Sequence, residues 1–312
     1  MLSFIDISFV YISRFLRKHP TWRRMLFLRV MKFGAYLGVD SCNIEIGSIY
    51  LNNCAFSWSR YDAAFWFYKS SLRGNKGSQY ILGTLLCSGL PVGSLSLEYN
   101  PNFFSRDNTP NLPEGIKWLR YAAEQGHAAA AGKLGDLLLN GPPEIRSPVE
   151  GVQFLLAAAK QNIPAAQLSL GQWWVTNAVD DAMRRVAASY VSLAADNGHP
   201  PAIYIKGIML ERGFGLLQDK AESVRCFQIS SASNIPASQR KYAIELLKGK
   251  IVKRNAFKAE TLLRKSARAG DYESAELLAY LYETGLAFHR SSTEASIWRT
   301  VALSNRQALS FT

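Results

Sequence analysis

Apolar and small residues recur at helical spacing throughout the chain, and the pattern is clearest between Glu114 and Gly141. In the first half of this stretch, the positions that share one helix face are Trp118, Leu119, Ala122 and Ala123. Gly126 then ends the helix, because a residue without Cβ adopts the left-handed conformation at little cost. A second apolar face follows, with Ala130, Leu134, Gly135 and Leu138. The stretch therefore predicts a hairpin of two helices with small residues at their contact.

The same hairpin pattern returns every 36 residues, with one interruption. Taking Gly135 as the reference, the equivalent positions are Gly47, Gly83, Gly135, Gly171, Gly207, Ala243 and Ala279; the step after Gly83 is 16 residues longer. Nine residues before the reference stand only Gly or Asn, namely Gly38, Gly74, Gly126, Asn162, Gly198, Asn234 and Gly270. Six residues after it stand Asn53, Gly89, Gly141, Asn177, Gly213, Gly249 and Gly285. Since Gly and Asn best tolerate the left-handed conformation, we expect each of them to end a helix.

Two further columns predict how the helices of a pair pack. Small residues stand at Ala63, Gly115, Gly151, Ala187, Ser223, Ala259 and Ala295. Three residues later stand mostly large ones, Trp66, Trp118, Phe154, Tyr190, Cys226, Leu262 and Trp298. Small and large surfaces thus alternate at fixed places, as stacked hairpins require.

The register predicts an all-α fold, a right-handed α/α solenoid of about seven hairpins. The helix pairs are expected at 42–53 with 60–74, 76–89 with 112–126, 128–141 with 148–162, 164–177 with 180–198, 200–213 with 219–234, 236–249 with 255–270, and 272–285 with 291–305. One period earlier, residues 2–17 and 21–37 form a degenerate capping pair. We therefore expect a basic amphipathic cap over residues 1–41 and the repeat solenoid over residues 42–312.

Three segments carry a family resemblance: LRYAAEQGHAAAAGKLGDLLLNG, SLAADNGHPPAIYIKGIMLERGFG and DKAESVRCF. They resemble the Sel-one-like repeat, a relative of the tetratricopeptide repeat with a period of roughly 36 to 44 residues. The resemblance covers about residues 42–305, and its departures are local: Asn162 and Asn234 replace one glycine, Ala243 and Ala279 another. It implies a protein-binding adaptor in signalling, secretion, envelope biogenesis or protein quality control. Some bacterial relatives act as injected effectors or as immunity proteins.

The segment 90–111 holds the 16-residue insertion and is rich in Pro, Gly, Asn and Ser. A loop of this length inside a regular array is often functional. Phe103 and Phe104 lie at its centre. Two readings stay open: these rings pack onto the helices, or they contact a partner.

The face of each first helix that points away from the core is the second candidate binding surface. Positions three before and one after the reference include Tyr80, Gln172, Tyr204, Ile208, Arg240 and Tyr280. Exposed tyrosines and apolar residues suit a protein interface better than a polynucleotide track. Basic residues between Arg240 and Arg254 form a local patch, which an ordinary solvated helix and turn explain equally well. We therefore expect another protein as partner and no nucleic acid.

The chain of 312 residues carries 36 basic and 24 acidic side chains, a net charge of +12. About half of this excess lies in residues 1–39, where an apolar stripe is formed by Leu2, Ile5, Phe9, Ile12 and Leu16. This segment is read as a cap on the first hairpin; the alternative is contact with an anionic membrane surface. No positive charge precedes the apolar run and no small-residue cleavage site follows, so we expect no cleavable signal peptide. A cytoplasmic location is favoured, with peripheral membrane contact through residues 1–39 kept open.

Motifs for catalysis are not found in the sequence. Asp180 and Asp181 are read as helix-capping residues, and His127 and His199 as tolerated loop residues in one repeat column. Trp174 falls in the core column. The four cysteines and four histidines are far apart in sequence, so no metal site, cofactor or catalytic residue is expected. The chain is interpreted as a non-catalytic adaptor; the alternatives are an immunity or inhibitor protein that occludes a toxic enzyme, a secreted effector, and, less favoured, a hydrolase.

Overall fold

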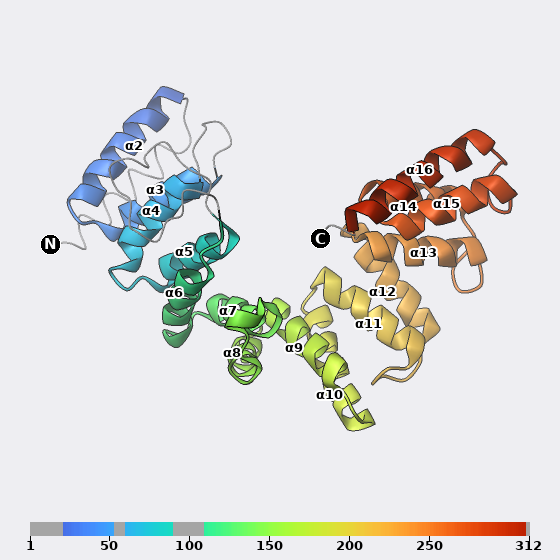
Figure 1. Cartoon of the computed structure of the whole chain (residues 1–312), viewed down its shortest axis with the longest axis horizontal. Coiled ribbons are helices and arrows are strands. Elements are labelled where there is room, and N and C mark those ends of the chain that lie inside the picture. Colours follow the sequence, from blue (N-terminus) through green and yellow to red (C-terminus); the bar gives the residue numbers. More distant parts are fainter. Residues whose placement is uncertain (1–20, 53–59, 90–108, 310–312) are drawn as a thin grey trace. The chain divides into compact units, whose positions relative to one another are not determined.

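The computed structural model describes residues 21–52, 60–89 and 109–309 (Figure 1). Every regular element in these residues is helical, as the repeat pattern predicts. The chain divides into two compact units, Met1–Gln161 and Asn162–Thr312. Within each unit every helix packs against the next one along the chain. The predicted fold class, an array of helix pairs, is thus confirmed, whereas a separate cap over residues 1–41 stays a prediction.

The first unit contains seven α-helices among its described residues. They are α2 (Thr21–Tyr36), α3 (Asp40–Asn52), α4 (Arg60–Ser71), α5 (Lys76–Ser88), α6 (Leu112–Glu124), α7 (Ala128–Asn140) and α8 (Pro148–Lys160), with a short 3-10 helix at Pro143–Ile145 before α8. Met31 and Ala35 of α2 are buried in the same core cluster as Ile46 of α3. Helix α2 therefore packs against α3, the first helix of the next hairpin.

The second unit contains eight helices within residues 162–309. They are α9 (Pro164–Asn177), α10 (Asp181–Asp196), α11 (Pro200–Arg212), α12 (Lys220–Ala232), α13 (Pro236–Lys248), α14 (Ala256–Arg268), α15 (Tyr272–Thr284) and α16 (Ser292–Leu309). Most begin within one or two residues of the expected positions. Helix α16 runs past the expected end at residue 305, and the amide of Asn305 donates a hydrogen bond to the carbonyl of Ala267 at 2.8 Å.

The residues expected to end the second helix of each pair all do so. Gly38, Gly74, Gly126, Asn162, Gly198, Asn234 and Gly270 each have a positive φ, between 57° and 97°. The other column follows the expectation at Gly89, Gly213, Gly249 and Gly285, but not at Gly141 or Asn177. Gly141 precedes a proline, which forces it into extended backbone with φ −72° and ψ −178°. Asn177 is the last residue of α9, so the cap shifts to Ala178.

The reference glycines let the two helices of a hairpin touch. A Cβ on Gly135 would lie 2.7 Å from Cγ of Leu155 and 2.8 Å from the carbonyl oxygen of Gly151. Ser223 shows the same contact, since its hydroxyl donates to the carbonyl of Gly207 at 2.7 Å. The small column therefore faces the reference column across each pair.

The large residues that face the reference glycines lie one residue later than the column predicted from the sequence. In the second helices of six pairs the most deeply buried large residues are Phe67, Leu119, Leu155, Val191, Phe227 and Leu263, all with at most 1% exposure, whereas the seventh pair has the exposed Arg299 at this position. Successive residues of a helix point about 100° apart, so these side chains point at the glycine and their neighbours lie to the side. Trp66, Trp118 and Trp298 are still buried, whereas Phe154, Tyr190 and Leu262 are half-buried.

Candidate functional site

The candidate site is the first-helix face of the second unit. It consists of six residues, two on each of α11, α13 and α15: Tyr204, Ile208, Arg240, Ile244, Glu276 and Tyr280. Members of each pair stand four residues apart and so share one side of their helix. Four of the six are apolar or aromatic, so the face is mainly apolar.

Tyr204 is half-buried and not exposed as expected. Its ring lies 5.9 Å from the ring of Phe227, measured between centroids, with the planes tilted by 48°. Burial raises the pKa of the Tyr204 hydroxyl, while the nearby Arg240 guanidinium opposes that shift. The ring thus packs partly onto α12, and Ile208 and Ile244 are likewise half-buried.

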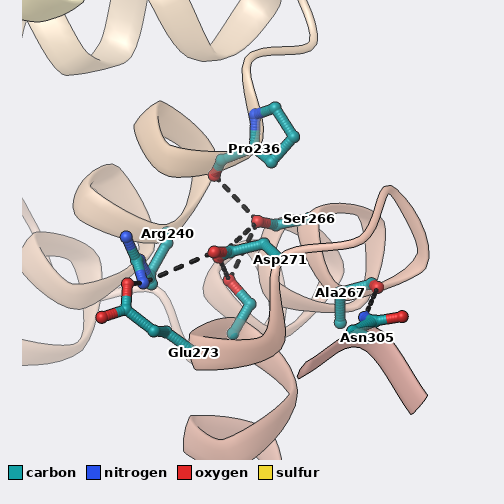
Figure 2. A network of polar contacts seen from close by, with 8 residues as sticks. Pro236, Arg240, Ser266, Ala267, Asp271, Glu273 and Asn305 are labelled. Atoms are coloured by element: carbon teal, nitrogen blue, oxygen red, sulfur yellow. Dashed lines mark hydrogen bonds and ion pairs between the residues drawn. The ribbon is translucent and has the colours of Figure 1, made fainter. Parts of the chain in front are cut away.

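Arg240 lies in a network of polar contacts with the next repeat (Figure 2). Its guanidinium forms ion pairs with Asp271, at 3.5 Å, and with Glu273, and only 16% of its side chain is exposed. Asp271 also accepts hydrogen bonds from Ser266, at 3.0 Å, and Ser274, at 2.5 Å. Arg240 therefore joins α13 to α15, and its charge is largely balanced inside the chain.

A second ion pair joins α13 to α11. Lys241 lies 2.8 Å from Glu211, and its ammonium group lies 5.8 Å from the centroid of the Phe227 ring. Because the charged groups along the face are mutually paired, the groups left for a partner are mainly aromatic and aliphatic.

Tyr280 is the most exposed aromatic residue of the face, with 54% exposure. It borders a cavity of about 360 Å³ between α15 and α16, which is also lined by Glu276, Glu283, Arg299 and Leu303. Arg299 is paired with Glu283 across this cavity. The opening accordingly combines an aromatic wall, the exposed Leu303 and a balanced pair of charges.

Two other predicted interface residues lie outside this face. Gln172 is exposed on α9 in the second unit. Tyr80 lies on α5 in the first unit and is half-buried, because its ring stacks on the ring of His127 at 4.8 Å with a 26° interplanar angle. Phe103 and Phe104 lie outside the described residues, so their role stays a prediction.

His127 has a structural role that the sequence interpretation missed. Its Nδ1 accepts a hydrogen bond from the backbone N–H of Ala130 at 3.2 Å, so it caps the N-terminus of α7. Burial and the nearby Lys76 lower the pKa of His127. The position directly after a helix-ending glycine was the available signal, since the next helix starts there.

The core interpretation of Trp174 is only partly right. Its side chain is half-buried, and its Nε1 is buried without a hydrogen-bond partner. The adjacent Trp173 ring lies 4.9 Å away, edge to face. The two rings pack on each other, and both are half-buried.

The perturbed titratable groups of the second unit lie in contacts between helices. Burial and a hydrogen bond with Glu260 raise the pKa of Tyr282 to about 12. Burial opposes the charge of Arg264, but hydrogen bonds with Tyr282 and Glu260 raise its pKa. Arg264 also pairs with Glu294 at 3.0 Å. This cluster holds α14, α15 and α16 together.

The described residues include three cysteines that form no disulfide with one another, Cys42, Cys87 and Cys226. Burial raises the pKa of Cys87 to about 11 and also raises that of Cys226, the opposite of what a nucleophilic thiolate needs. Within the described residues, no group of three His, Cys, Asp or Glu side chains could hold a metal ion. No helix in that same part of the chain has the length and apolar character needed to cross a membrane.

Comparison with known proteins agrees with this geometry. The Sel1 repeat model matches residues 108–127, 128–163, 200–234, 236–271 and 273–295. Among solved structures, a Sel1 repeat protein from Oxalobacter formigenes has a TM-score of 0.68 and 23% identity, covering 98% of this chain and 86% of that one. A protective antigen of uropathogenic Escherichia coli with an SLR fold has a TM-score of 0.69 and 22% identity, covering 89% of this chain and 56% of that one.

Among curated proteins, the mouse protein named DAP3-binding cell death enhancer 1 is 32% identical over 184 residues, 58% of this chain. The chain spans 32% of the length of that relative, and the same share of an uncharacterised protein of Neisseria meningitidis that is 25% identical over 155 residues. The segment 164–199 lies between two matched repeats and still forms the helix pair α9 and α10. The chain therefore contains five Sel1 repeats, and its fold is the array of helix pairs seen in the two solved structures.

Proposed function

We propose that this chain is a non-catalytic scaffold that binds another protein through the first-helix face of its second unit. The observation that carries the proposal is the run of Tyr204, Ile208, Ile244 and Tyr280 over three consecutive repeats. Aromatic and aliphatic side chains with few unpaired charges are the composition of a protein interface core. The five Sel1 repeats support the same class of function, because stacked helical repeats present extended surfaces for binding partners.

Helix-in-groove binding is the mode that fits this face. A partner helix presents apolar residues every three or four positions, and the face presents an apolar residue or pair at each repeat. The ion pairs of Arg240 and Lys241 hold α11, α13 and α15 in register, so the apolar positions are fixed in advance of binding.

Site-specific photo-crosslinking tests the proposal. A photoreactive amino acid at position 280 should capture a protein partner in cells. The matched control is position 257, because Phe257 is also exposed, at 82%, but lies on the second helix α14. Tyr204→Ala with Tyr280→Ala should abolish capture at 280, whereas Phe257→Ala should leave it intact. Equal capture at positions 257 and 280 would place the interface elsewhere.

Roles for Tyr80, Gln172 and the segment 90–111 in partner binding stay predictions. Contact of residues 1–39 with an anionic membrane and the immunity-protein alternative stay predictions as well. The membrane contact is tested by binding to anionic vesicles, which should disappear at high salt. The immunity-protein alternative is tested by rescue of cells from a co-encoded toxin.

A further inference from the structure

A cavity of about 530 Å³ opens between α11, α12 and α13 in the second unit. Val224 and Phe227, with 3% and 1% exposure, form its floor. Ile251 lines its wall, and the rim carries the lysines Lys220, Lys248 and Lys250. None of the six residues of the first-helix face lines this cavity, so the two are separate surfaces.

The preceding repeat shows what fits at this place. Thirty-six residues earlier, the positions of Lys220, Val224, Phe227, Lys250 and Ile251 are occupied by Arg184, Ala188, Val191, Phe214 and Gly215. There Phe214 packs against the cluster that contains Ala188 and Val191. The guanidinium of Arg184 lies 5.5 Å from the centroid of the Phe214 ring. The repeat thus fills the equivalent groove with its own aromatic ring and covers the ring with a cation.

The turn after α13 cannot repeat this arrangement. Gly215 has a φ of 66°, and a Cβ there would overlap the carbonyl of Arg184, so only glycine lets the turn come that close. Ile251 carries a branched side chain at the equivalent position, and Lys250 extends to solvent where Phe214 turns inward. The cavity is therefore open. Like the groove that Phe214 fills, it has an apolar floor and a cation at its edge, here Lys220.

The charges around the cavity are unbalanced. Among the described residues, no carboxylate forms an ion pair with four nearby exposed cations, Lys220, Lys250, Lys253 and Arg254. Glu211 in the lining is paired with Lys241 at 2.8 Å. Glu245 is paired with Lys248 at 2.6 Å. A ligand at this rim therefore meets an excess of positive charge.

We propose that this cavity binds an acidic segment of a partner protein by taking in one aromatic side chain. The ring lies on Val224 and Phe227 under the ammonium of Lys220, as Phe214 lies under Arg184. Acidic residues beside the ring face Lys250, Lys253 and Arg254. A protein segment is favoured over nucleic acid because the chain's own occupant of the equivalent groove in the preceding repeat is a phenylalanine side chain. The proposal rests on the proposed function only in that the ligand is a protein.

Fluorescence anisotropy with a labelled synthetic peptide tests this site. The probe is a short peptide of Glu and Asp residues with one central Phe; its two matched probes carry Ala in place of Phe, or Lys in place of the acids. The full chain should bind the first probe with an affinity that falls as salt increases. The Ala probe should bind about tenfold or more weakly, since burial of the ring is lost. The Lys probe should not bind.

Three variants locate the site. Lys220→Glu should weaken binding by about threefold to tenfold, and Lys265→Glu, an exposed lysine on α14, should not change it. Lys250→Phe with Ile251→Gly copies the preceding repeat, so it should fill the cavity, abolish binding and leave the melting temperature unchanged or higher.

Equal binding of the Phe and Ala probes, or unchanged binding by the filled variant, overturns the proposal. So does a single-stranded oligonucleotide that binds more tightly than the peptide and loses affinity with Lys220→Glu. Tyr280→Ala alone should leave peptide binding unchanged, because Tyr280 lies on α15 and does not line this cavity; this variant separates failure of this site from failure of the first-helix face.

Discussion

The hydroxyl groups of Ser230 on α12 and Ser238 on α13 are hydrogen-bonded at 2.8 Å, and both residues are fully buried. The same pair of positions holds Ser with Ser in two other copies, at 70 with 78 and at 266 with 274, hydrogen-bonded at 2.8 Å and 2.9 Å. In the three remaining complete copies both positions are Ala: 122 with 130, 158 with 166 and 194 with 202. In each of these copies the two positions therefore hold the same residue type, both Ser or both Ala, because a buried hydroxyl needs a hydrogen-bond partner.

This pairing predicts a non-additive mutational effect. Ser230 also donates to the carbonyl of Cys226 at 2.7 Å, whereas Ser238 depends on Ser230. Ser230→Ala should lower the free energy of unfolding by about 1–3 kcal/mol, because the Ser238 hydroxyl is left unpaired. Adding Ser238→Ala should recover part of that loss. A double-mutant cycle by urea denaturation measures the coupling, and additive effects would show that the two hydroxyls are independent.

Gln239 predicts a stabilising substitution. In two other copies the equivalent buried glutamine accepts a hydrogen bond from a side-chain amide at the end of the second helix of the same pair: Gln79 from Gln125 at 2.8 Å, and Gln167 from Asn197 at 3.0 Å. In the copy of Gln239 the position equivalent to Gln125 is Ala269, and among the described residues the Oε1 of Gln239 has no hydrogen-bond partner although it is buried.

Ala269→Gln should supply that partner, since Ala269 and Gln125 share nearly the same backbone, with φ −84° and −79° and ψ 10° in both. The expected gain is about 0.5–1.5 kcal/mol in the free energy of unfolding. The gain should vanish in a Gln239→Leu background. If it persists there, it comes from helix capping and not from this hydrogen bond.

His127 predicts a loss of stability in mild acid. Its pKa is lowered in the folded chain, so below about pH 6.5 the unfolded chain binds the proton more readily than the folded chain. The stabilising contribution of His127 is therefore complete above that pH and decreases as the pH falls through the lowered value. Thermal melts between about pH 7.5 and 5 measure the slope.

His127→Asn provides the control for this pH dependence. Asn75 occupies the same repeat position and caps α5 by accepting from the N–H of Ser78 at 3.0 Å. The variant should keep the cap and reduce the slope between pH 7 and 5. An unchanged slope would assign the effect to other groups, of which His199, also with a lowered pKa, is the first to test.

Replacing Asn234 by glycine or by alanine should affect the stability of the chain differently. It ends α12 with a φ of 61°, at the position that is Gly in five copies. Asn234→Ala should cost about 1–2 kcal/mol, because Cβ meets the backbone in this conformation and alanine lacks the polar group that lets asparagine adopt it. Asn234→Gly should be neutral or stabilising. Calorimetric melting of the two variants checks this, and equal melting temperatures would contradict the backbone explanation.

Much of the fold was available in the sequence because it is specified locally. The column of Gly74, Gly126 and their equivalents marks the helix ends through backbone conformation, which depends on the residue itself. The spacing of small residues marks where two helices approach, and Gly135 against Gly151 confirms it. The sequence placed the column of large packing residues at Trp118, one residue before the side chain that contacts the glycine, Leu119. Neighbouring residues of a helix point about 100° apart, so only the contacts in the structure show which of the two faces the glycine.

The candidate site depended on more distant relationships. Arg240 was expected at an interface, and the structure has it paired with two carboxylates of the next repeat. Tyr80 and Tyr204 were expected to be exposed, and each ring packs on a neighbouring ring. These contacts join residues that are 23 to 47 positions apart in the sequence, so no local pattern specifies them.

The sequence by itself determined the helix pairs, their ends and their 36-residue period, because each follows from backbone preference and from apolar spacing within one repeat. Only the tertiary structure decided which polar groups are already paired between repeats and which grooves the turns fill. Phe214 and Lys250 occupy the same column, and both look like ordinary turn residues in sequence. One closes its groove and the other leaves it open, because the residue after each, Gly215 or Ile251, sets how closely the turn approaches the helices.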